Sequence, residues 1–173
     1  SLKKKHLIPF TFGDSVAFLF SVTANTIYWA GDFNGWEPNE SFKGNIIGLG
    51  TIWILEKKYP SDARLDYKII KDGNWILDPD NEYKQLSGFG YNSELRMPNW
   101  IYPQETIITA EINRGQLSNN FLIHSSTLNY DINYRVYKPF GYDGFSNLPV
   151  LYVTDGHEYA NDQMGSLIIV LDN

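Results

Sequence analysis

Residues 67–81, YKIIKDGNWILDPDN, decide how the first half of this 173-residue chain folds. Two runs rich in β-branched and aromatic residues flank the dipeptide Asp72-Gly73, and such runs are typical of strands. A two-residue turn between antiparallel strands needs positive φ angles, which Asp and Gly adopt more readily than most residues. The stretch therefore predicts a β-hairpin with strands over residues 65–72 and 74–78.

The pattern continues toward the amino terminus. Residues 15–22, 26–30 and 51–59 have strand composition and are separated by turn residues. No long stretch of helical period interrupts them. Short strands at this spacing predict an all-β sandwich.

Composition and charge exclude several classes of function. Hydrophobic residues make up 43% and charged residues 20% of the chain, as in a globular protein. The formal net charge is −6, and without clustered cations we expect no nucleic-acid partner. Aromatic residues reach 16%, which favours strands and ligands with a face on which a ring can stack.

Metal and cofactor chemistry find little support in the sequence. The chain has no cysteine, which removes disulfides, thiol nucleophiles and thiolate zinc sites. The acidic run DPDNE, residues 78–82, lacks the central Gly and distant Glu of a calcium loop. We therefore expect no cofactor and no metal site.

No apolar run approaches the roughly 20 residues of a membrane span. The first residue is Ser rather than Met, which fits a removed leader. As a separate expectation, a periplasmic or secreted bacterial-type protein is slightly favoured over a cytoplasmic one.

The second half of the chain differs from the first. Pro98 and Pro103 interrupt strand pairing, and predict a linker over residues 98–105 between a domain of residues 1–97 and one of residues 106–173. Within the second domain, residues 106–112, 120–125 and 132–137 have strand composition.

The run LPVLYVT, residues 148–154, is almost continuously apolar. Such a run is typical of a strand buried on both faces of a largely parallel sheet. A loop and a helix over residues 164–173 are predicted to follow. Because a doubly buried strand needs helices and neighbouring strands that the remaining residues do not supply, we expect this chain to be the front part of a larger protein.

Two ordered motifs carry a first family resemblance. GDFNGW, residues 31–36, is followed by the hairpin stretch of residues 67–81. Together they resemble the early-set immunoglobulin-like domains related to family-48 carbohydrate-binding modules, which include the glycogen-binding module of the AMP-activated kinase β subunit and the amino-terminal domains of isoamylases and branching enzymes. The resemblance covers roughly residues 12–95.

This resemblance implies a sugar site. Trp36 and Trp75 correspond to the stacking platforms of that family, and Lys68 and Asn92 to its polar partners. A pyranose ring offers an apolar face to an indole and hydroxyls to amide or ammonium donors. The same residues also have a structural interpretation, in which Trp36 caps the sandwich, Trp75 packs on its strand and Lys68 is an ordinary outward residue.

A second resemblance begins near residue 132. The stretch INYRVYKPFGYDGFSNLPVLYVTDGHEYAND, residues 132–162, is similar to the start of the catalytic domain of the family of enterochelin esterases, feruloyl esterases and esterase D. The matching residues are Arg135, Tyr137, Pro139, Gly141, Tyr142, Asp143, Asp155 and Gly156. Several members of that family carry a sandwich of the first type directly in front.

The esterase resemblance implies an α/β-hydrolase fold and a catalytic triad of Ser, an acid and His. The loop of Asp155, Gly156 and His157 would lie beside the active site and could give a backbone N–H to the oxyanion hole, whose donors are each worth about 2.7 to 4 kcal/mol in transition-state stabilisation. The other interpretation makes Asp155-Gly156 a tight turn and leaves His157 in a surface loop.

The triad itself is not expected within these residues. No G-x-S-x-G elbow lies between a strand and a helix, and His6, His124 and His157 are not spaced with a Ser and an acid in the order of this fold. We therefore assign no catalytic residue here and expect the triad beyond Asn173.

Three hypotheses follow for function. The first is the amino-terminal part of a serine ester hydrolase, whose sandwich shapes selection of a small-molecule ester or glycan-linked ester. The second is an α-glucan-binding module with a non-catalytic hydrolase-like segment, and the third is a non-catalytic interaction protein. The sequence leaves a homodimer open as an assembly.

Overall fold

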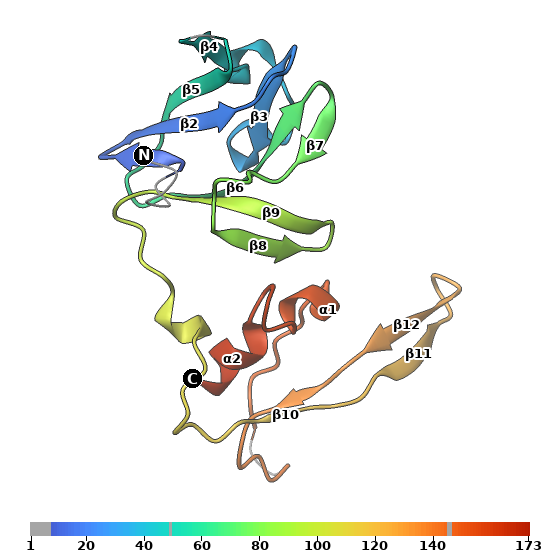
Figure 1. The fold of residues 1–173 in the computed structure, drawn as a ribbon. Coiled ribbons are helices and arrows are strands. Elements are labelled where there is room, and N and C mark those ends of the chain that lie inside the picture. The colour runs from blue at the N-terminus through green and yellow to red at the C-terminus, as the bar shows by residue number, and fades with distance from the viewer. Residues whose placement is uncertain (1–7, 49, 145–146) are drawn as a thin grey trace. The chain divides into compact units, whose positions relative to one another are not determined.

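The computed structural model describes residues 8–48, 50–144 and 147–173 (Figure 1). His6 lies outside the described residues. The chain forms two compact units, Ser1–Tyr102 and Pro103–Asn173, and is mostly β-sheet with few helices. The division falls within the segment expected to be a linker, while the domain bounds 1–97 and 106–173 stay a prediction.

Two antiparallel sheets build the first unit (Figure 1). The first sheet has the order β1-β2-β5-β4 and contains β1 (Phe10–Phe12), β2 (Ser15–Ser21), β4 (Asn45–Ile47) and β5 (Ile52–Lys58). The second has the order β3-β6-β9-β8, with β7 also paired to β6, and contains β3 (Ile27–Gly31), β6 (Arg64–Lys71), β7 (Asn74–Ile76), β8 (Lys84–Ser87) and β9 (Gly90–Arg96). Two short 3-10 helices, η2 (Asp32–Asn34) and η3 (Glu40–Phe42), lie between β3 and β4.

One apolar core joins the two sheets. Successive side chains of a strand point to opposite faces, so β2 turns Val16, Phe18 and Phe20 inward. They pack with side chains of the other sheet, among them Trp29 and Tyr67, which are both fully buried. Burying each large side chain stabilises the fold by about 1.5 to 3 kcal/mol. The shared core makes this unit a β-sandwich.

The predicted hairpin turn is confirmed. Asp72 and Gly73 have φ angles of 48° and 83°, and Lys71 pairs with Asn74 across the turn. Both central residues therefore adopt the left-handed conformation that a two-residue hairpin needs.

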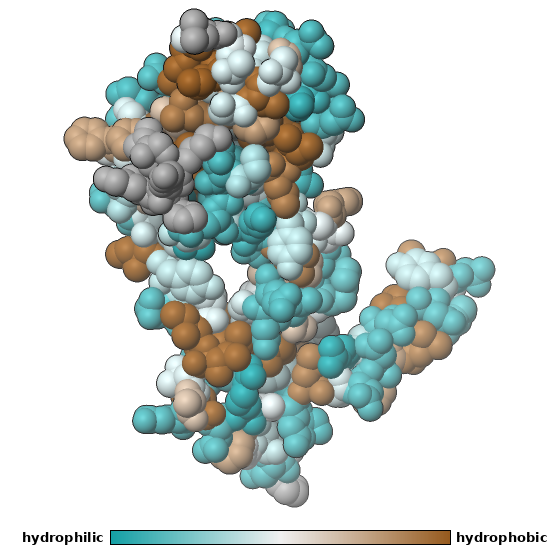
Figure 2. Space-filling view, viewed as in Figure 1, coloured by the Kyte–Doolittle hydropathy of each residue, from teal (hydrophilic) through white to brown (hydrophobic). Residues whose placement is uncertain are grey.

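The second unit contains short elements. The helix expected over residues 164–173 is confirmed as α2 (Leu167–Asp172), which has six residues. The other elements are η4 (Gln104–Thr106), β10 (Gln116–Leu117), which pairs with β13 (Tyr137–Lys138), β11 (Phe121–Ser125), which pairs with β12 (Tyr130–Tyr134), and α1 (Gly156–Tyr159). Figure 2 shows apolar side chains on the surface of the β11–β12 hairpin, whose Phe121, Leu122 and Ile123 are all exposed.

A carboxylate of α2 connects this helix to the start of the second unit. Asp172 Oδ1 accepts hydrogen bonds from the Gly115 N–H at 2.7 Å and the Tyr137 hydroxyl at 2.8 Å. Its Oδ2 accepts one from Arg114 Nε at 2.8 Å. Partial burial raises the pKa of Tyr137 to about 12, helped by its bond to Asp172.

The prediction of a buried strand over residues 148–154 is wrong for this structure. The segment is irregular and belongs to no sheet, and Val150 and Tyr152 are 72% and 91% exposed. A strand needs neighbours that bond its N–H and C=O groups, and within the described residues no strand pairs with it. The α/β-hydrolase sheet is therefore not formed here.

Two smaller expectations also differ from the structure. Residues 106–112 form no strand, because η4 and a turn occupy this segment instead. The expected loop after residue 154 contains α1. Among the described residues, no helix has the length and apolar character needed to cross a bilayer.

Candidate functional site

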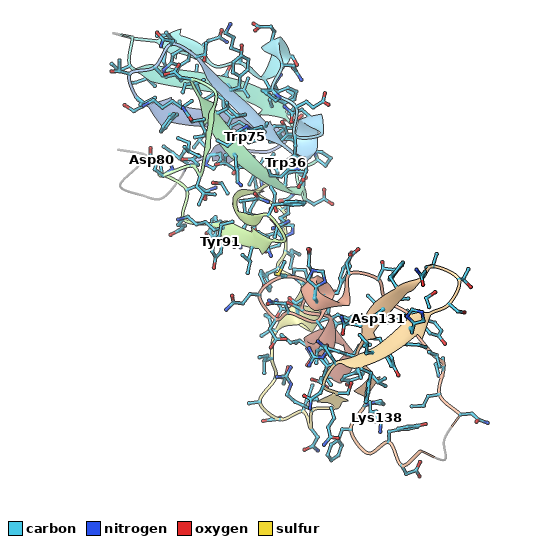
Figure 3. All side chains as sticks on the ribbon, turned by 90° about the vertical axis from the view of Figure 1, so that its right-hand side faces the viewer. Trp36, Trp75, Asp80, Tyr91, Asp131 and Lys138 are labelled. Carbon is cyan, nitrogen blue, oxygen red and sulfur yellow. The ribbon has the colours of Figure 1, made fainter. Side chains whose placement is uncertain are left out.

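Two tryptophans lie together on the sandwich (Figure 3). The ring centroids of Trp36 and Trp75 are 6.5 Å apart, and their planes differ by 25°. Trp75 is 46% exposed and Trp36 is half-buried. Two nearly parallel indoles with exposed surface can bind a flat apolar ligand face.

The loop GDFNGW holds Trp36 in an unusual conformation. Gly35 and Trp36 have φ angles of 64° and 63°, and a left-handed backbone is rare for a bulky residue. Such a conformation costs about 1 to 3 kcal/mol and persists only where the surroundings impose it. Here the Trp36 N–H donates to Gly31 O at 3.0 Å, and Asn34 Oδ1 accepts from the Gly31 N–H at 2.9 Å. The loop is therefore ordered before any ligand binds.

The second tryptophan stands on the outer face of the second sheet. Trp75 on β7 pairs with Ile70 on β6, so the two side chains share a face. Lys68 is two residues before Ile70 and therefore points to the same side. It is half-buried and pairs with Ala30 of β3. The structure thus places Trp75 and Lys68 on one face, and the sugar site itself stays a prediction.

Asn92 has a different environment from the one expected. It lies on the same outer face, on β9, but only 7% of it is exposed. Its Nδ2 donates to Asp66 Oδ2 at 3.2 Å. Because this side chain is buried and bonded within the sheet, it supports Asp66 and offers little surface to a ligand.

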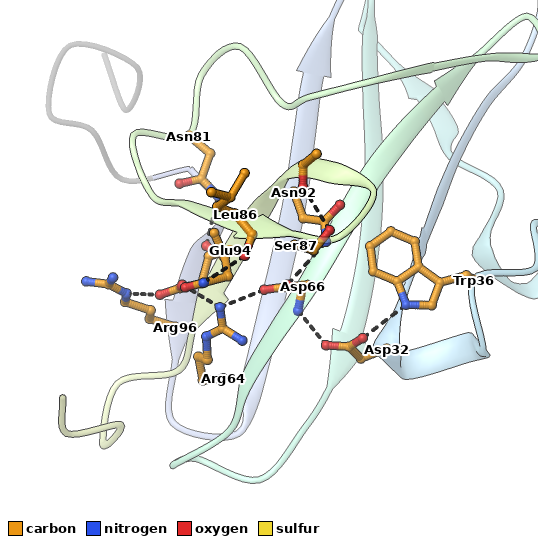
Figure 4. Close-up of polar contacts among 12 residues, drawn as sticks. Asp32, Trp36, Arg64, Asp66, Asn81, Leu86, Ser87, Asn92, Glu94 and Arg96 are labelled. Atoms are coloured by element: carbon orange, nitrogen blue, oxygen red, sulfur yellow. Dashed lines mark hydrogen bonds and ion pairs between the residues drawn. The ribbon is translucent and has the colours of Figure 1, made fainter. Parts of the chain in front are cut away.

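A polar network extends from the Trp36 indole along the second sheet (Figure 4). Asp32 Oδ1 accepts from Trp36 Nε1 at 3.0 Å, and its Oδ2 accepts from the Asp66 N–H at 2.8 Å. Asp66 Oδ1 in turn lies 2.8 Å from the guanidinium of Arg64. Burial raises the pKa of Asp66, although Arg64 and the bond from Asn92 oppose this shift.

The network ends at a second aromatic group. Arg64 also donates to Glu94 at 2.7 Å, and Glu94 accepts from Arg96 as well. The Arg96 guanidinium lies 3.9 Å from the ring centroid of Tyr83 and 4.7 Å from that of Trp100. Contacts of this kind are worth about 0.5 to 2 kcal/mol each, so this end of the network stabilises the sheet and the segment that follows it.

Sequence reasoning missed the acids and arginines of this network. The available signal was the alternation of Arg64, Asp66 and Lys68 along one strand, which places three polar side chains on the same face. The partners of these residues lie about thirty positions away, as Asp32 and Glu94 do, and local patterns do not reveal them.

The three residues of the hypothetical active-site loop belong to the second unit. Asp155 has a φ of 51° and precedes α1, whose first two residues are Gly156 and His157. The His157 side chain is 81% exposed, with Nε2 3.7 Å from Glu158 Oε1. Added to Gly156, a Cβ would meet open space. These facts fit a solvent-facing turn, and the oxyanion-hole role stays a prediction.

The candidate site offers side chains that can contact a ligand. Within residues 8–48, 50–144 and 147–173, no group of three or more acidic or histidine side chains could hold a metal ion. The tryptophan pair supplies apolar surface, and Lys68 adds a cation on the same face. This arrangement suits a neutral ligand with a flat face and hydrogen-bonding groups at its edge.

No protein-family model matches the chain, and no curated protein matches it either. Solved structures do match. The ferric enterobactin esterase from Salmonella typhimurium has a TM-score of 0.50 and 13% identity, over 71% of this chain and 40% of that one. The enterobactin esterase from Shigella flexneri, in the presence of enterobactin, has a TM-score of 0.44 and 16% identity, over 71% and 38%. The chain thus spans about two fifths of the length of these esterases. At such identity the likeness concerns the fold alone, and the chain shares a fold with part of the Salmonella esterase.

Proposed function

We propose that this chain is the amino-terminal part of a serine ester hydrolase of the enterochelin-esterase type. The fold likeness to ferric enterobactin esterase is the observation that carries the proposal. It covers 71% of the chain, whereas the sandwich unit ends at Tyr102 of 173 residues. The likeness therefore extends past the sandwich. The resemblance of residues 132–162 to the start of an esterase domain supports the same assignment.

In this proposal the sandwich shapes substrate selection and the triad follows Asn173. Trp36 and Trp75 offer aromatic surface suited to the aryl group of an ester, because offset aromatic stacking adds about 0.5 to 1.5 kcal/mol beyond area burial. A catechol-bearing siderophore ester such as enterobactin, or a feruloylated sugar, has such a group. Both are small-molecule substrates.

The test is made on the full-length protein encoded by the gene. Reading beyond Asn173 should reveal a Ser in a strand-to-helix elbow, followed by an acid and a His. The purified protein should hydrolyse p-nitrophenyl acetate, methyl ferulate or enterobactin, and replacement of that Ser by Ala should abolish turnover. Absence of the triad, or inactivity toward all three esters, would refute the proposal.

A second candidate function is binding of an α-glucan by the sandwich. The observation that favours it is the placement of Trp36, Trp75 and Lys68 around one outer face. Calorimetry with maltoheptaose should detect binding, and Trp36→Ala and Trp75→Ala should each weaken it about tenfold, equivalent to 1.4 kcal/mol. Phe89→Ala is a matched control, because Phe89 is 98% exposed at the β8–β9 turn. Binding unaffected by either tryptophan change would exclude this site.

A further inference from the structure

We propose that Asp32 is the positioning residue of the tryptophan pair, holding the Trp36 indole beside Trp75 so that the two rings form one preorganised platform. The inference rests on the second candidate function, in which this pair binds a glucan. It extends that function by naming Asp32 as the residue on which the geometry of the tryptophan pair, and so its affinity for the glucan, depends.

The contacts of Asp32 connect the loop to the sheet. One carboxylate oxygen accepts from Trp36 Nε1 at 3.0 Å, and the other accepts from the backbone N–H of Asp66 at 2.8 Å. Strand β3 ends where Gly31 pairs with Tyr67. The next residue, Asp32, continues the pairing with β6 through its side chain. Its carboxylate accepts from the Asp66 N–H, where a main-chain carbonyl would accept in a longer strand. The indole is bonded through one residue to a rigid strand.

Gly31 makes this connection sterically feasible. A Cβ at this position would lie 2.1 Å from Asp66 O and 2.8 Å from Tyr67 Cβ. The chain thus crosses close to β6 just before Asp32, which brings the carboxylate within reach of the Asp66 N–H. Each of the two donors bonds a different oxygen of this one short side chain, which therefore links the indole to the strand.

The backbone of Trp36 does not by itself fix the ring. Its φ of 63° sets the backbone at this residue, but rotation about χ1 and χ2 would still move an indole that is only half-buried. The bond to Asp32 and the packing on Trp75 select one orientation. A ligand that binds a preorganised ring loses less conformational freedom on binding.

The same bond also removes a desolvation penalty. A ligand that covers Trp36 would exclude water from the indole N–H, and a buried donor without a partner costs about 1 to 3 kcal/mol. Asp32 accepts a hydrogen bond from this N–H in the free protein and continues to do so under a bound ligand. The carboxylate therefore acts on affinity without touching the ligand.

The experiment uses the whole chain with Asp32→Ala and Asp32→Asn. Ala removes both acceptors, whereas Asn keeps one acceptor oxygen for two donors. Glu37→Gln is the matched control, because Glu37 is an exposed acid next to Trp36 and its loss changes the charge equally. Two close indoles couple their electronic transitions, so circular dichroism near 225 nm measures the pair without ligand. Trp75→Phe gives the spectrum of a broken pair.

We expect Asp32→Ala to remove most of the coupled signal and to weaken maltoheptaose binding about tenfold. Asp32→Asn should reduce both the signal and the affinity by less. Glu37→Gln should resemble the unmodified protein in both measurements. If the coupled signal falls while even the unmodified protein binds no maltoheptaose, the positioning role stands and the glucan function fails. If Asp32→Ala does not fold, Asp32→Asn decides. A coupled signal unchanged in the folded Asp32 variants would overturn the proposal.

Discussion

The Tyr67 hydroxyl is the centre of a buried polar group, and its removal tests how this group stabilises the sandwich. Tyr67 is fully buried. Its hydroxyl donates to Asp78 Oδ2 at 2.7 Å and accepts from Asn81 Nδ2 at 3.1 Å. Tyr67→Phe keeps the ring and its edge-to-face contact with Phe18, in which the two ring centroids are 5.1 Å apart. The change therefore deletes two hydrogen bonds and little packing.

The expected loss follows from those two bonds. A hydrogen bond to a charged group contributes about 1.5 to 3 kcal/mol and a neutral one about 1 kcal/mol. In the variant, Asp78 still accepts a hydrogen bond from the Asp80 N–H at 2.9 Å, so it is not left without a partner. We therefore expect a decrease of about 2 to 3 kcal/mol in the free energy of unfolding. With a urea m value of about 1.5 kcal/mol/M, the midpoint should fall by about 1.5 M. Fluorescence of the core residues Trp29 and Trp53 reports this transition.

The control is a tyrosine in the same unit whose ring is not buried. Tyr91 is 51% exposed, and Tyr91→Phe should change stability by less than about 0.5 kcal/mol, as surface substitutions usually do. The m value should stay constant in both variants. If Tyr67→Phe lowers the midpoint no more than Tyr91→Phe does, the hydroxyl does not support the buried carboxylate and the reasoning is wrong.

Three further predictions concern pH and two crowded glycines. Burial raises the pKa of Tyr67 well above its usual value, so above about pH 10 the unfolded chain loses a proton that the folded chain keeps. The free energy of unfolding should then decline by up to about 1.4 kcal/mol per pH unit, and urea titrations at pH 9 to 11 should show a smaller decline for Tyr67→Phe. Gly31→Ala places a Cβ 2.1 Å from Asp66 O and should cost about 1 to 3 kcal/mol, lowering the melting temperature by roughly 10 °C; an unchanged melting temperature would contradict the close approach. Gly115→Ala places a Cβ 2.4 Å from Lys138 O, so limited proteolysis should cleave the second unit faster, and equal cleavage rates would count against the contact.

The sequence predicted most of the sandwich because its strands alternate apolar and polar residues. Strand β2 matches residues 15–22, and β6 and β7 match the two arms of the predicted hairpin. The four strands β1, β4, β8 and β9 were not predicted. In β9 the consecutive residues Asn92, Ser93 and Glu94 are all buried, which hides the alternation. Their burial depends on partners elsewhere in the chain, such as Asp78, whose N–H donates to Ser93 Oγ at 2.8 Å.

The candidate site was predictable only in part. The family resemblance singled out Trp36 and Trp75, and the structure brings them together. It also singled out Asn92, whose burial follows from its bond to Asp66. The contribution of Asp32 could not be predicted, because it depends on where β3 ends relative to β6. Strand register fixes that distance, and a local pattern of residues does not encode it.

The segment of residues 148–154 shows why composition alone did not fix a strand. Strand β2 and this segment are similarly apolar, yet β2 is paired on both edges, to β1 and β5, while Val150 and Tyr152 in the segment are exposed. A segment without neighbouring strands has no hydrogen-bond partners for its backbone groups and no surface against which to bury its side chains. Backbone hydrogen bonds and side-chain burial are both needed to offset the entropy lost on ordering. Apolar composition therefore indicates how much surface a segment has to bury, whereas pairing partners determine whether it becomes a strand. Within the described residues, β2 meets both conditions and residues 148–154 meet only the first.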